Sequence, residues 1–109
     1  MECVFCNIVQ GKNPAALEWE DEKVIAIRDA NPQAPIHLLI IPKEHFPSIG
    51  DVPSDTLLAM LETVKALAAQ EVFSNGYRIV INKGPDGGQT VHHAHVHLLG
   101  GRPFGWPPG

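Results

Sequence analysis

Three histidines occupy alternate positions in one short apolar run: His93, His95 and His97. An apolar residue follows each of them, so the run has the two-residue period of a β-strand and not the 3.6-residue period of a helix. In a strand, residues i, i+2 and i+4 point to the same face of the sheet. The run therefore predicts a strand that carries three imidazoles on one face and turns its apolar residues toward a core on the other.

The three imidazoles also predict chemistry. Imidazole has an unperturbed pKa close to neutrality, so it can attack, donate a proton or accept one at cellular pH. Packing alone gives little reason to place three such rings on one face. The alternative is a solvated sheet face that is rich in histidine and has no chemical role.

Periodicity along the rest of the chain predicts the other elements. Apolar spacing favours a short helix after Cys3 that stops near Gly11, and a long helix that is capped at residues 53–55 and ends before residue 74. Alternation favours four more strands, over residues 16–20, 24–29, 37–41 and 77–82. Together they predict an α+β domain with an antiparallel sheet of about five strands, one long helix and one short helix.

Length and charge limit the organisation and the partners. With 109 residues we expect a single domain, residues 1–109, with the Pro- and Gly-rich segment 101–109 as a docked C-terminal tail because Phe104 and Trp106 are too apolar for a free end. The net charge of -4 argues against a nucleic-acid partner. No apolar run approaches the ~20 residues of a membrane span, and the N-terminus lacks the pattern of a secretory signal. We therefore expect a cytoplasmic protein without a membrane partner.

Two cysteines, Cys3 and Cys6, lie close together in a Cys-x-x-Cys motif. This spacing fits metal chelation or a redox pair better than a structural disulfide between distant segments. A redox pair normally opens a helix after a strand, and no strand precedes this one. The spacing therefore favours a metal site that needs two further ligands, with two free buried cysteines as the alternative.

The segment before the histidine run predicts an anion site. Its residues are Gly87, Gly88, Gln89 and Thr90, and Asn82 at the end of the preceding strand is placed to reach the same pocket. Glycine allows close approach of the backbone to a ligand, and neutral donors beside imidazoles suit one phosphoryl group. The sequence has neither a Walker-type loop nor an acidic cluster for Mg²⁺, so we expect no catalytic metal. The alternative is that the two glycines only form a hairpin loop.

The chain resembles the histidine-triad (HIT) superfamily in segments that follow one another in the same order along nearly its whole length. They are Asp29-Ala30-Asn31-Pro32-Gln33-Ala34-Pro35-Ile36-His37, Ile41-Pro42-Lys43-Glu44-His45, Gly87-Gly88-Gln89-Thr90, His93-Ala94-His95-Val96-His97-Leu98-Leu99 and Trp106-Pro107-Pro108-Gly109. The last of these is similar to the ending of the histidine-triad nucleotide-binding (HINT) branch. The resemblance implies a HIT-like fold over the whole domain. Thr90 departs from the serine that is usual in this branch.

The resemblance further implies a homodimeric purine nucleoside phosphoramidase or nucleotide hydrolase that acts at the α-phosphorus. His95 would be the nucleophile and form a covalent nucleotidyl-histidine, which water then cleaves. His97 and Thr90 would hold the phosphoryl oxygens and assist the leaving amine. His93 would fix the tautomer of His95 through its carbonyl, and His37 would support the site from a neighbouring strand. The substrates implied are a purine nucleotide, a nucleoside phosphoramidate or an aminoacyl adenylate.

Nucleotide-binding residues are carried over in the same way. Asp29 would accept the ribose hydroxyls, and the base pocket would be lined by Phe5, Ile8, Ile27 and Ala30. The phosphate side would involve Asn82, Gly88, Gln89 and Thr90. The alternatives are that Phe5, Ile8 and Ile27 are simple core residues, that Asp29 only begins a turn, and that His37 has no role.

The resemblance also supplies the missing metal ligands. Zinc-containing members would use Cys3, Cys6, His45 and His93 as a closed structural site, with one Zn²⁺ per subunit. A rival hypothesis makes the three alternate histidines a zinc tripod that activates water. Residues i and i+4 of a strand lie ~13 Å apart, too far for three imidazoles to share one ion easily. Two further alternatives are a nucleotide-binding interaction module with incidental hydrolysis and a dinucleoside polyphosphate hydrolase.

Overall fold

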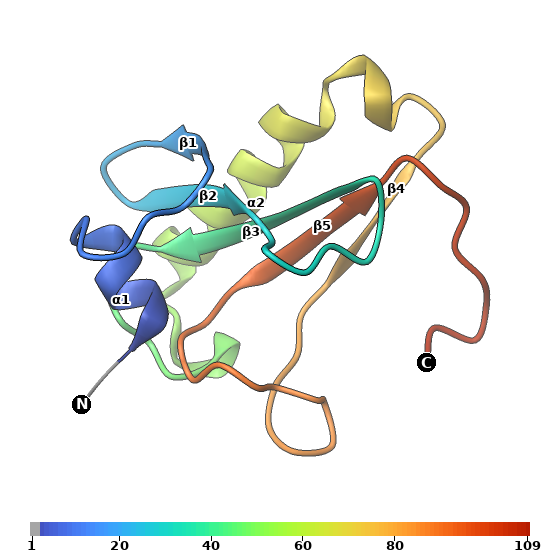
Figure 1. The fold of residues 1–109 in the computed structure, drawn as a ribbon. Coiled ribbons are helices and arrows are strands. Elements are labelled where there is room, and N and C mark those ends of the chain that lie inside the picture. Colours follow the sequence, from blue (N-terminus) through green and yellow to red (C-terminus); the bar gives the residue numbers. More distant parts are fainter. Residues whose placement is uncertain (1–2) are drawn as a thin grey trace.

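The sheet is the organising element of this chain (Figure 1). The structure is a computed structural model in which residues 3–109 are described. Its elements, in chain order, are α1 (Val4–Val9), β1 (Leu17–Glu20), β2 (Val24–Arg28), β3 (Ile36–Pro42), the 3-10 turn η1 (Ile49–Asp51), α2 (Ser54–Ala68), the 3-10 turn η2 (Glu71–Phe73), β4 (Tyr77–Val80) and β5 (Val96–Gly100). The strands pair antiparallel in the order β1-β2-β3-β5-β4. The predicted α+β architecture is confirmed.

The sheet has one face covered by α2 and another covered in part by α1 (Figure 1). On the α2 face, Met60, Val64 and Leu67 pack against apolar residues of the central strands. On the opposite face, Phe5 of α1 packs with a smaller apolar group whose buried members are Ile25, Ile27, Leu39 and Ile41. Because successive strand residues alternate between faces, β2 and β3 can be buried on both sides and are almost wholly apolar.

The register of β3 against β5 brings distant histidines together. His37 lies opposite Leu99, and Leu39 lies opposite His97. Directly opposed residues share a face, and so do residues two apart on one strand, which makes His37 and His97 diagonal neighbours on the α1 face. Two positions 60 residues apart in the sequence therefore meet in the middle of the sheet.

The histidine strand is shorter than the sequence predicts. Strand β5 begins at Val96, so only His97 lies in regular strand, while His93 and His95 precede it. In the β3–β5 register Ala94 would face Pro42, which has no N–H to pair, and the N–H of Ala94 instead donates to the carbonyl of Phe46 at 2.7 Å. The predicted alternation of faces continues nonetheless, because Ala94 is buried in the α2-side core.

The long helix agrees with its predicted bounds. Helix α2 has Pro53 as its N-cap and Asp55 in its first turn, and it ends at Ala68, before residue 74. The turn η2 follows it and buries Phe73 against β5, where a Cβ on Gly100 would overlap the Phe73 ring. Within residues 3–109, no helix is long and apolar enough to cross a membrane.

Candidate functional site

The structure gathers the three triad histidines and His37 on the α1 face of the sheet. The ring centroids of His95 and His97 lie 5.0 Å apart, and those of His37 and His97 lie 5.1 Å apart. Phe5 of α1 packs edge-on against the rings of His93 and His95, with centroids at 5.8 and 5.2 Å. His37, His93 and His95 are buried, and His97 is half-buried. Each ring is therefore held by contacts on more than one side.

Backbone atoms fix the proton positions on these rings, beginning with His95. Its Nδ1 lies 2.8 Å from the carbonyl oxygen of His93. A carbonyl can only accept, so Nδ1 carries the proton and Nε2 carries the free lone pair. In the neutral ring, this tautomer places the nucleophilic nitrogen on the side away from the backbone of His95.

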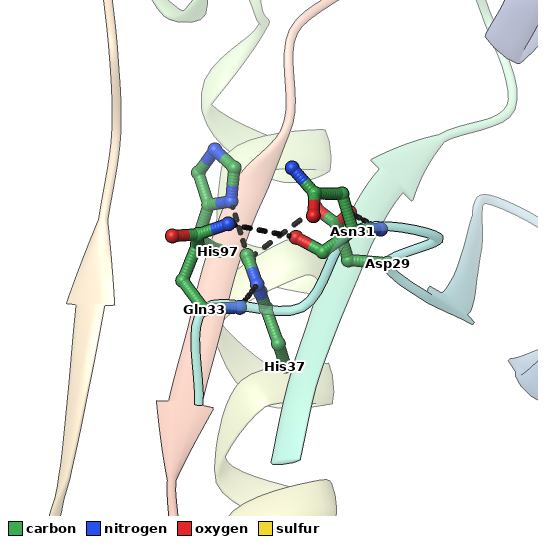
Figure 2. Close-up of polar contacts among 5 residues, drawn as sticks. All are labelled: Asp29, Asn31, Gln33, His37 and His97. Atoms are coloured by element: carbon green, nitrogen blue, oxygen red, sulfur yellow. Dashed lines mark hydrogen bonds and ion pairs between the residues drawn. The ribbon is translucent and has the colours of Figure 1, made fainter. Parts of the chain in front are cut away.

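His37 and His97 form a second hydrogen-bonded unit with Asp29 (Figure 2). The N–H of Gln33 donates to Nδ1 of His37 at 3.0 Å, so the proton of His37 resides on Nε2. That nitrogen faces Nδ1 of His97 at 2.9 Å and an oxygen of Asp29 at 3.4 Å. His97 therefore accepts at Nδ1 and presents an N–H at Nε2. We refer to Asp29, His37 and His97 as the relay cluster.

The environment keeps the relay cluster histidines neutral at pH 7. Burial, helped by the neighbouring His95 and His37, lowers the pKa of His97 to about 4, although Asp29 opposes the shift. Burial also lowers the pKa of His37, and Asp29 again acts in the opposite direction. Neutral rings are required for the donor and acceptor pattern described above.

A separate cluster brings together Cys3, Cys6, His45 and His93, and we call it the thiol cluster. The Nδ1 atoms of His45 and His93 lie 3.2 Å apart. The Sγ of Cys6 lies 3.3 Å from His45 Nδ1 and 3.5 Å from His93 Nδ1, and the Sγ of Cys3 lies 3.4 Å from His93 Nδ1. A tetrahedral Zn²⁺ with bonds of ~2.0 Å to nitrogen and ~2.3 Å to sulfur has edges of ~3.3 and ~3.5 Å between its ligands. These four distances match the edges that zinc requires, and all four donor atoms lie within 4.8 Å of one another.

The protonation of the thiol cluster also fits a cation. Nε2 of His93 lies 2.8 Å from the carbonyl of Pro42, so its proton points away and its Nδ1 lone pair points into the cluster. Burial lowers the pKa of His93, which keeps that ring neutral. Burial and the adjacent Cys3 raise the pKa of the Cys6 thiol, and a bound cation would offset both effects by stabilising thiolate.

The relay cluster has a comparable spacing but does not fit a metal. Its three donor atoms also lie within 4.8 Å of one another. Because Nδ1 of His37 already accepts from Gln33, its Nε2 could bind a cation only if the ring became an imidazolate. Hydrogen bonds account for the relay cluster without a metal.

The glycine segment before the triad is a tight loop. The N–H groups of Gly88 and Gln89 donate to the carbonyls of Pro85 and Gly84 within the loop. Gly88 has φ of +76°, and a Cβ on Gly87 would overlap the backbone of Lys83. These bonds and contacts account for the glycines as loop residues, and they leave the N–H groups of Gly88 and Gln89 paired with loop carbonyls and not free for an anion.

The predicted polar donors around this loop have different surroundings. The side chain of Gln89 donates to the carbonyls of Pro47 and Val91 and accepts from the N–H of Gly84, so it braces the loop. Asn82 donates to the carbonyl of Gly87, also within the loop. Thr90 is exposed. Contact of these residues with a nucleotide stays a prediction.

The predicted base-pocket residues are only partly brought together. Phe5, Ile8 and Ile27 belong to one apolar cluster, in which Phe5 and Ile27 are buried and Ile8 is half-buried. Ala30 is exposed in the loop after β2 and lies outside that cluster. Asp29 is half-buried, and its second oxygen accepts from the N–H of Asn31 at 2.8 Å.

Two cavities lie beside the triad histidines. One, of about 740 Å³, lies between η2, β4 and the tail, with Tyr77 and Arg102 among its lining residues. The other, of about 480 Å³, lies on the outer side of the thiol cluster and is lined in part by Cys6, His45 and Thr90.

The carbonyl of His93 as partner of His95 was implied by the family resemblance, but the backbone partners of His37 and His93 and the contact that Arg102 makes with Gln33 were not predicted. Arg102 donates from Nε and Nη2 to the carbonyl of Gln33 at 3.2 and 3.0 Å. An arginine between two glycine-rich segments carries no periodic signal, and the carbonyl it meets is common to every residue type. Its position just after β5 was the one available indication.

Comparison with known proteins gives consistent matches. The family model described as HIT domain matches residues 10–104. A 14 kDa zinc-binding protein of Zea mays is 48% identical over 111 residues, which cover 97% of this chain and 87% of that protein. Adenylylsulfatase HINT1 of Arabidopsis thaliana is 45% identical, over 97% of this chain and 76% of its own length. The crystal structure of a HIT family hydrolase from Legionella pneumophila Philadelphia 1 superposes with a TM-score of 0.94 at 50% identity, over 99% of this chain and 100% of that one.

Proposed function

This chain belongs to the HIT domain family, and we propose that it is a purine nucleoside phosphoramidase that cleaves at the α-phosphorus. The similarity to a HIT family hydrolase supports hydrolysis of a nucleotide in general. The observation that carries the proposal is the state of His95, whose Nδ1–H is held by the carbonyl of His93 so that Nε2 presents a lone pair. A buried imidazole fixed in this way is prepared for nucleophilic attack at phosphorus.

In the proposed reaction, Nε2 of His95 attacks the α-phosphorus and the bond from phosphorus to the amine breaks. The amine leaves with a proton from solvent, and His95 becomes a nucleotidyl-histidine whose positive charge is stabilised by the hydrogen bond from Nδ1–H to the His93 carbonyl. Water then attacks the same phosphorus and loses a proton to solvent, and the bond to His95 breaks so that its lone pair returns. Splitting one displacement into two easier steps is the advantage of the covalent route.

His97 acts on the phosphoryl oxygens. Its Nδ1 is occupied by His37, so its Nε2–H is the group that it can offer to an anionic oxygen. The Thr90 hydroxyl supplies a second neutral donor to the oxygens and the leaving amine. His93 contributes its carbonyl to His95, and His37 acts through His97 without touching substrate.

The nucleoside is held on the α1 side of the histidines. The aromatic ring of Phe5 and the aliphatic side chains of Ile8 and Ile27 offer the base an apolar surface beside His95. Ala30, exposed in the loop after β2, contacts the base from outside this cluster, and Asp29 accepts the ribose hydroxyls. Asn82, Gly88 and Gln89 lie on the phosphate side. The adenylylsulfatase among the relatives supports an adenine nucleotide as the substrate class.

The thiol cluster holds one structural zinc per subunit. The distances between its donor atoms support a tetrahedral site, and a zinc-binding protein at 48% identity supports the choice of metal. When bound, zinc ties α1 to the segment that carries His93 and neutralises the two thiolates. Cysteines held as zinc thiolates fit a reducing, cytoplasmic location. No step of the reaction needs a catalytic metal.

The active form is a homodimer. Strand β4 is an outer strand of the sheet, and its apolar residues Tyr77 and Ile79 are 47% and 40% exposed. An unpaired strand edge with exposed apolar residues favours pairing with a second copy. Trp106 of the tail is 84% exposed and is available for the same interface.

Trapping the covalent intermediate tests this function. We expect that brief incubation with adenosine 5′-phosphoramidate, followed by acid-free quenching and peptide mass spectrometry, places an adenylyl group on the peptide that contains His95. The His95→Asn variant is the matched control and should carry no adduct. An adduct on another residue, or steady turnover by the variant, would contradict the assignment.

A further inference from the structure

The loop of residues 29–35, between β2 and β3, is held in place by the C-terminal tail. Arg102 donates twice to the carbonyl of Gln33, and its guanidinium stacks on the ring of Phe104 at 4.2 Å. Gly101 has φ of +91° and approaches Pro35 so closely that a Cβ would meet the proline ring. The tail is thus fitted to this loop at two neighbouring points.

Gln33 connects this junction to the relay cluster. Its N–H donates to Nδ1 of His37, and its side-chain amide donates to the carbonyl of Asn31 at 3.0 Å (Figure 2). The same residue therefore accepts from Arg102 through its carbonyl and donates to His37 through its N–H. Arg102 and His97 are linked by two residues, Gln33 and His37.

We propose that Arg102 is a positioning residue for the phosphoryl-transfer reaction, acting through Gln33 and His37 to hold His97 in the tautomer that presents Nε2–H to the substrate. The inference rests on the proposed function for its catalytic meaning, but the tautomers themselves are a property of the free protein. Arg102 touches neither the substrate nor the reacting atoms.

The physical reason is that a neutral imidazole has two tautomers of similar energy in water. The N–H of Gln33 selects the Nε2–H form of His37, and that proton selects the Nε2–H form of His97. If Gln33 moves away, His37 can carry its proton on Nδ1, and Nδ1 of His97 loses its donor. His97 is then no longer held in the tautomer that presents Nε2–H to the substrate. A bidentate guanidinium is suited to fixing one carbonyl in direction as well as distance.

Arg78 provides a matched control. Its guanidinium lies over the same Phe104 ring at 5.2 Å and donates to the carbonyl of Gly105 at 2.7 Å. Arg78 therefore contacts Phe104 as Arg102 does, but within residues 3–109 its guanidinium donates to Gly105 and not to Gln33. Loss of Arg78 should disturb the tail and leave the relay cluster unchanged.

The test reads the tautomers directly in the zinc-loaded protein without substrate, by two-bond ¹⁵N–¹H correlation spectra of the imidazoles. We expect His37 and His97 of the wild type and of Arg78→Met to be Nε2–H forms. In Arg102→Met we expect both to become mixtures, and in Arg102→Lys, which keeps the charge and one donor, an intermediate result. Unchanged tautomers in Arg102→Met overturn the inference. If that variant does not fold, wild-type spectra for Arg102→Lys overturn it.

Kinetics with adenosine 5′-phosphoramidate supply the second readout. We expect kcat of Arg102→Met to fall by about tenfold with KM within about twofold of the wild type, because misplaced groups act on the transition state. His97 is faced by Asp29, His37 and His95, and loss of the donor from His37 should move the acid limb of kcat to higher pH. If the wild type had no activity but Arg102→Met still changed the tautomers of His37 and His97, only the proposed function would be contradicted. Full activity with altered tautomers would overturn the positioning role.

Discussion

Two histidine clusters flank His95, and they differ in chemistry although they are similar in composition and spacing. The thiol cluster and the relay cluster each place nitrogen, sulfur or oxygen atoms within 4.8 Å of one another. In the thiol cluster, the ring of His93 donates a hydrogen bond to the carbonyl of Pro42 and turns a lone pair inward. In the relay cluster, the ring of His37 accepts a hydrogen bond from the N–H of Gln33 and turns its own N–H inward.

This difference teaches that the backbone partner, and not the residue type, assigns each histidine its role. Where one ring nitrogen donates to a backbone carbonyl, the other nitrogen has a lone pair and can act as a ligand or a nucleophile, as at His93 and His95. Where one ring nitrogen accepts from a backbone N–H, the other nitrogen carries the proton and acts as a donor, as at His37. The same rule explains why one cluster fits Zn²⁺ and the other is complete as a set of hydrogen bonds.

The largest expected effect lies at His95, which belongs to neither cluster. Replacing His95 with Ala should lower kcat for adenosine 5′-phosphoramidate by at least about 10⁴-fold, since no other lone pair is presented for attack. Binding of AMP, measured by calorimetry, should change little, and the zinc content should be that of the wild type. Turnover of the variant within about tenfold of the wild type would show that the two clusters do not serve a common nucleophile.

The next test separates the clusters by metal content. Cys6→Ser should lose the zinc and lower the apparent Tm by at least about 10 °C, because a metal that binds only the folded state stabilises it. His37→Asn should keep one zinc per chain. Metal analysis of both purified variants checks this. His92→Ala is the control, because His92 is an exposed histidine that lines the cavity next to the thiol cluster. Equal zinc in Cys6→Ser and wild type would contradict the assignment of the thiol cluster.

The sequence predicted which side chains lie together more completely than it predicted the backbone contacts that orient them. Alternation placed His95 and His97 on the face opposite the core, and the resemblance supplied Cys3, Cys6 and His45 as companions of His93. The start of β5 at Val96 was missed because it depends on Pro42 across the sheet, a non-local partner. The resemblance supplied the His93 carbonyl as the partner of His95, but the partners that fix the tautomers of His37 and His93 were missed, since carbonyl and N–H groups are the same at every position.

Two details beyond these could not be predicted from the sequence. Phe73 of η2 reaches the core beside Gly100, and the local sequence gives no sign of that contact. The anion site predicted at the glycine segment would need free backbone N–H groups, but carbonyls of the same loop accept from those of Gly88 and Gln89.

A smaller effect is expected within the relay cluster. His37→Asn should lower kcat by about 10- to 100-fold, because His97 keeps its place on β5 but loses the donor that selects its tautomer. Steady-state kinetics should show the loss in kcat with little change in KM. If His37→Asn and Cys6→Ser reduced kcat equally and both lost zinc, the clusters would form one unit and the comparison would fail.

The smallest expected effect is on the pH dependence of stability. The pKa of His97 is lowered to about 4 in the folded protein, from about 6.5 in the unfolded chain. The unfolded chain then binds the proton more tightly, so the contribution of His97 is fully present above pH 6.5 and is lost as the pH falls toward 4. His37, whose pKa is also lowered, acts in the same direction.

Urea unfolding of the wild type and of His97→Asn at pH 7 and pH 5 isolates this contribution. Other groups that titrate in this range, including ligands of the thiol cluster, are common to both proteins and cancel in the difference. We expect the wild type to lose about 1 kcal/mol more than the variant between the two pH values, an amount discounted for the partial exposure of His97. Equal losses in the two proteins would mean that His97 is protonated as easily when folded as when unfolded. The relay cluster would then lack the neutral rings that distinguish it from the thiol cluster.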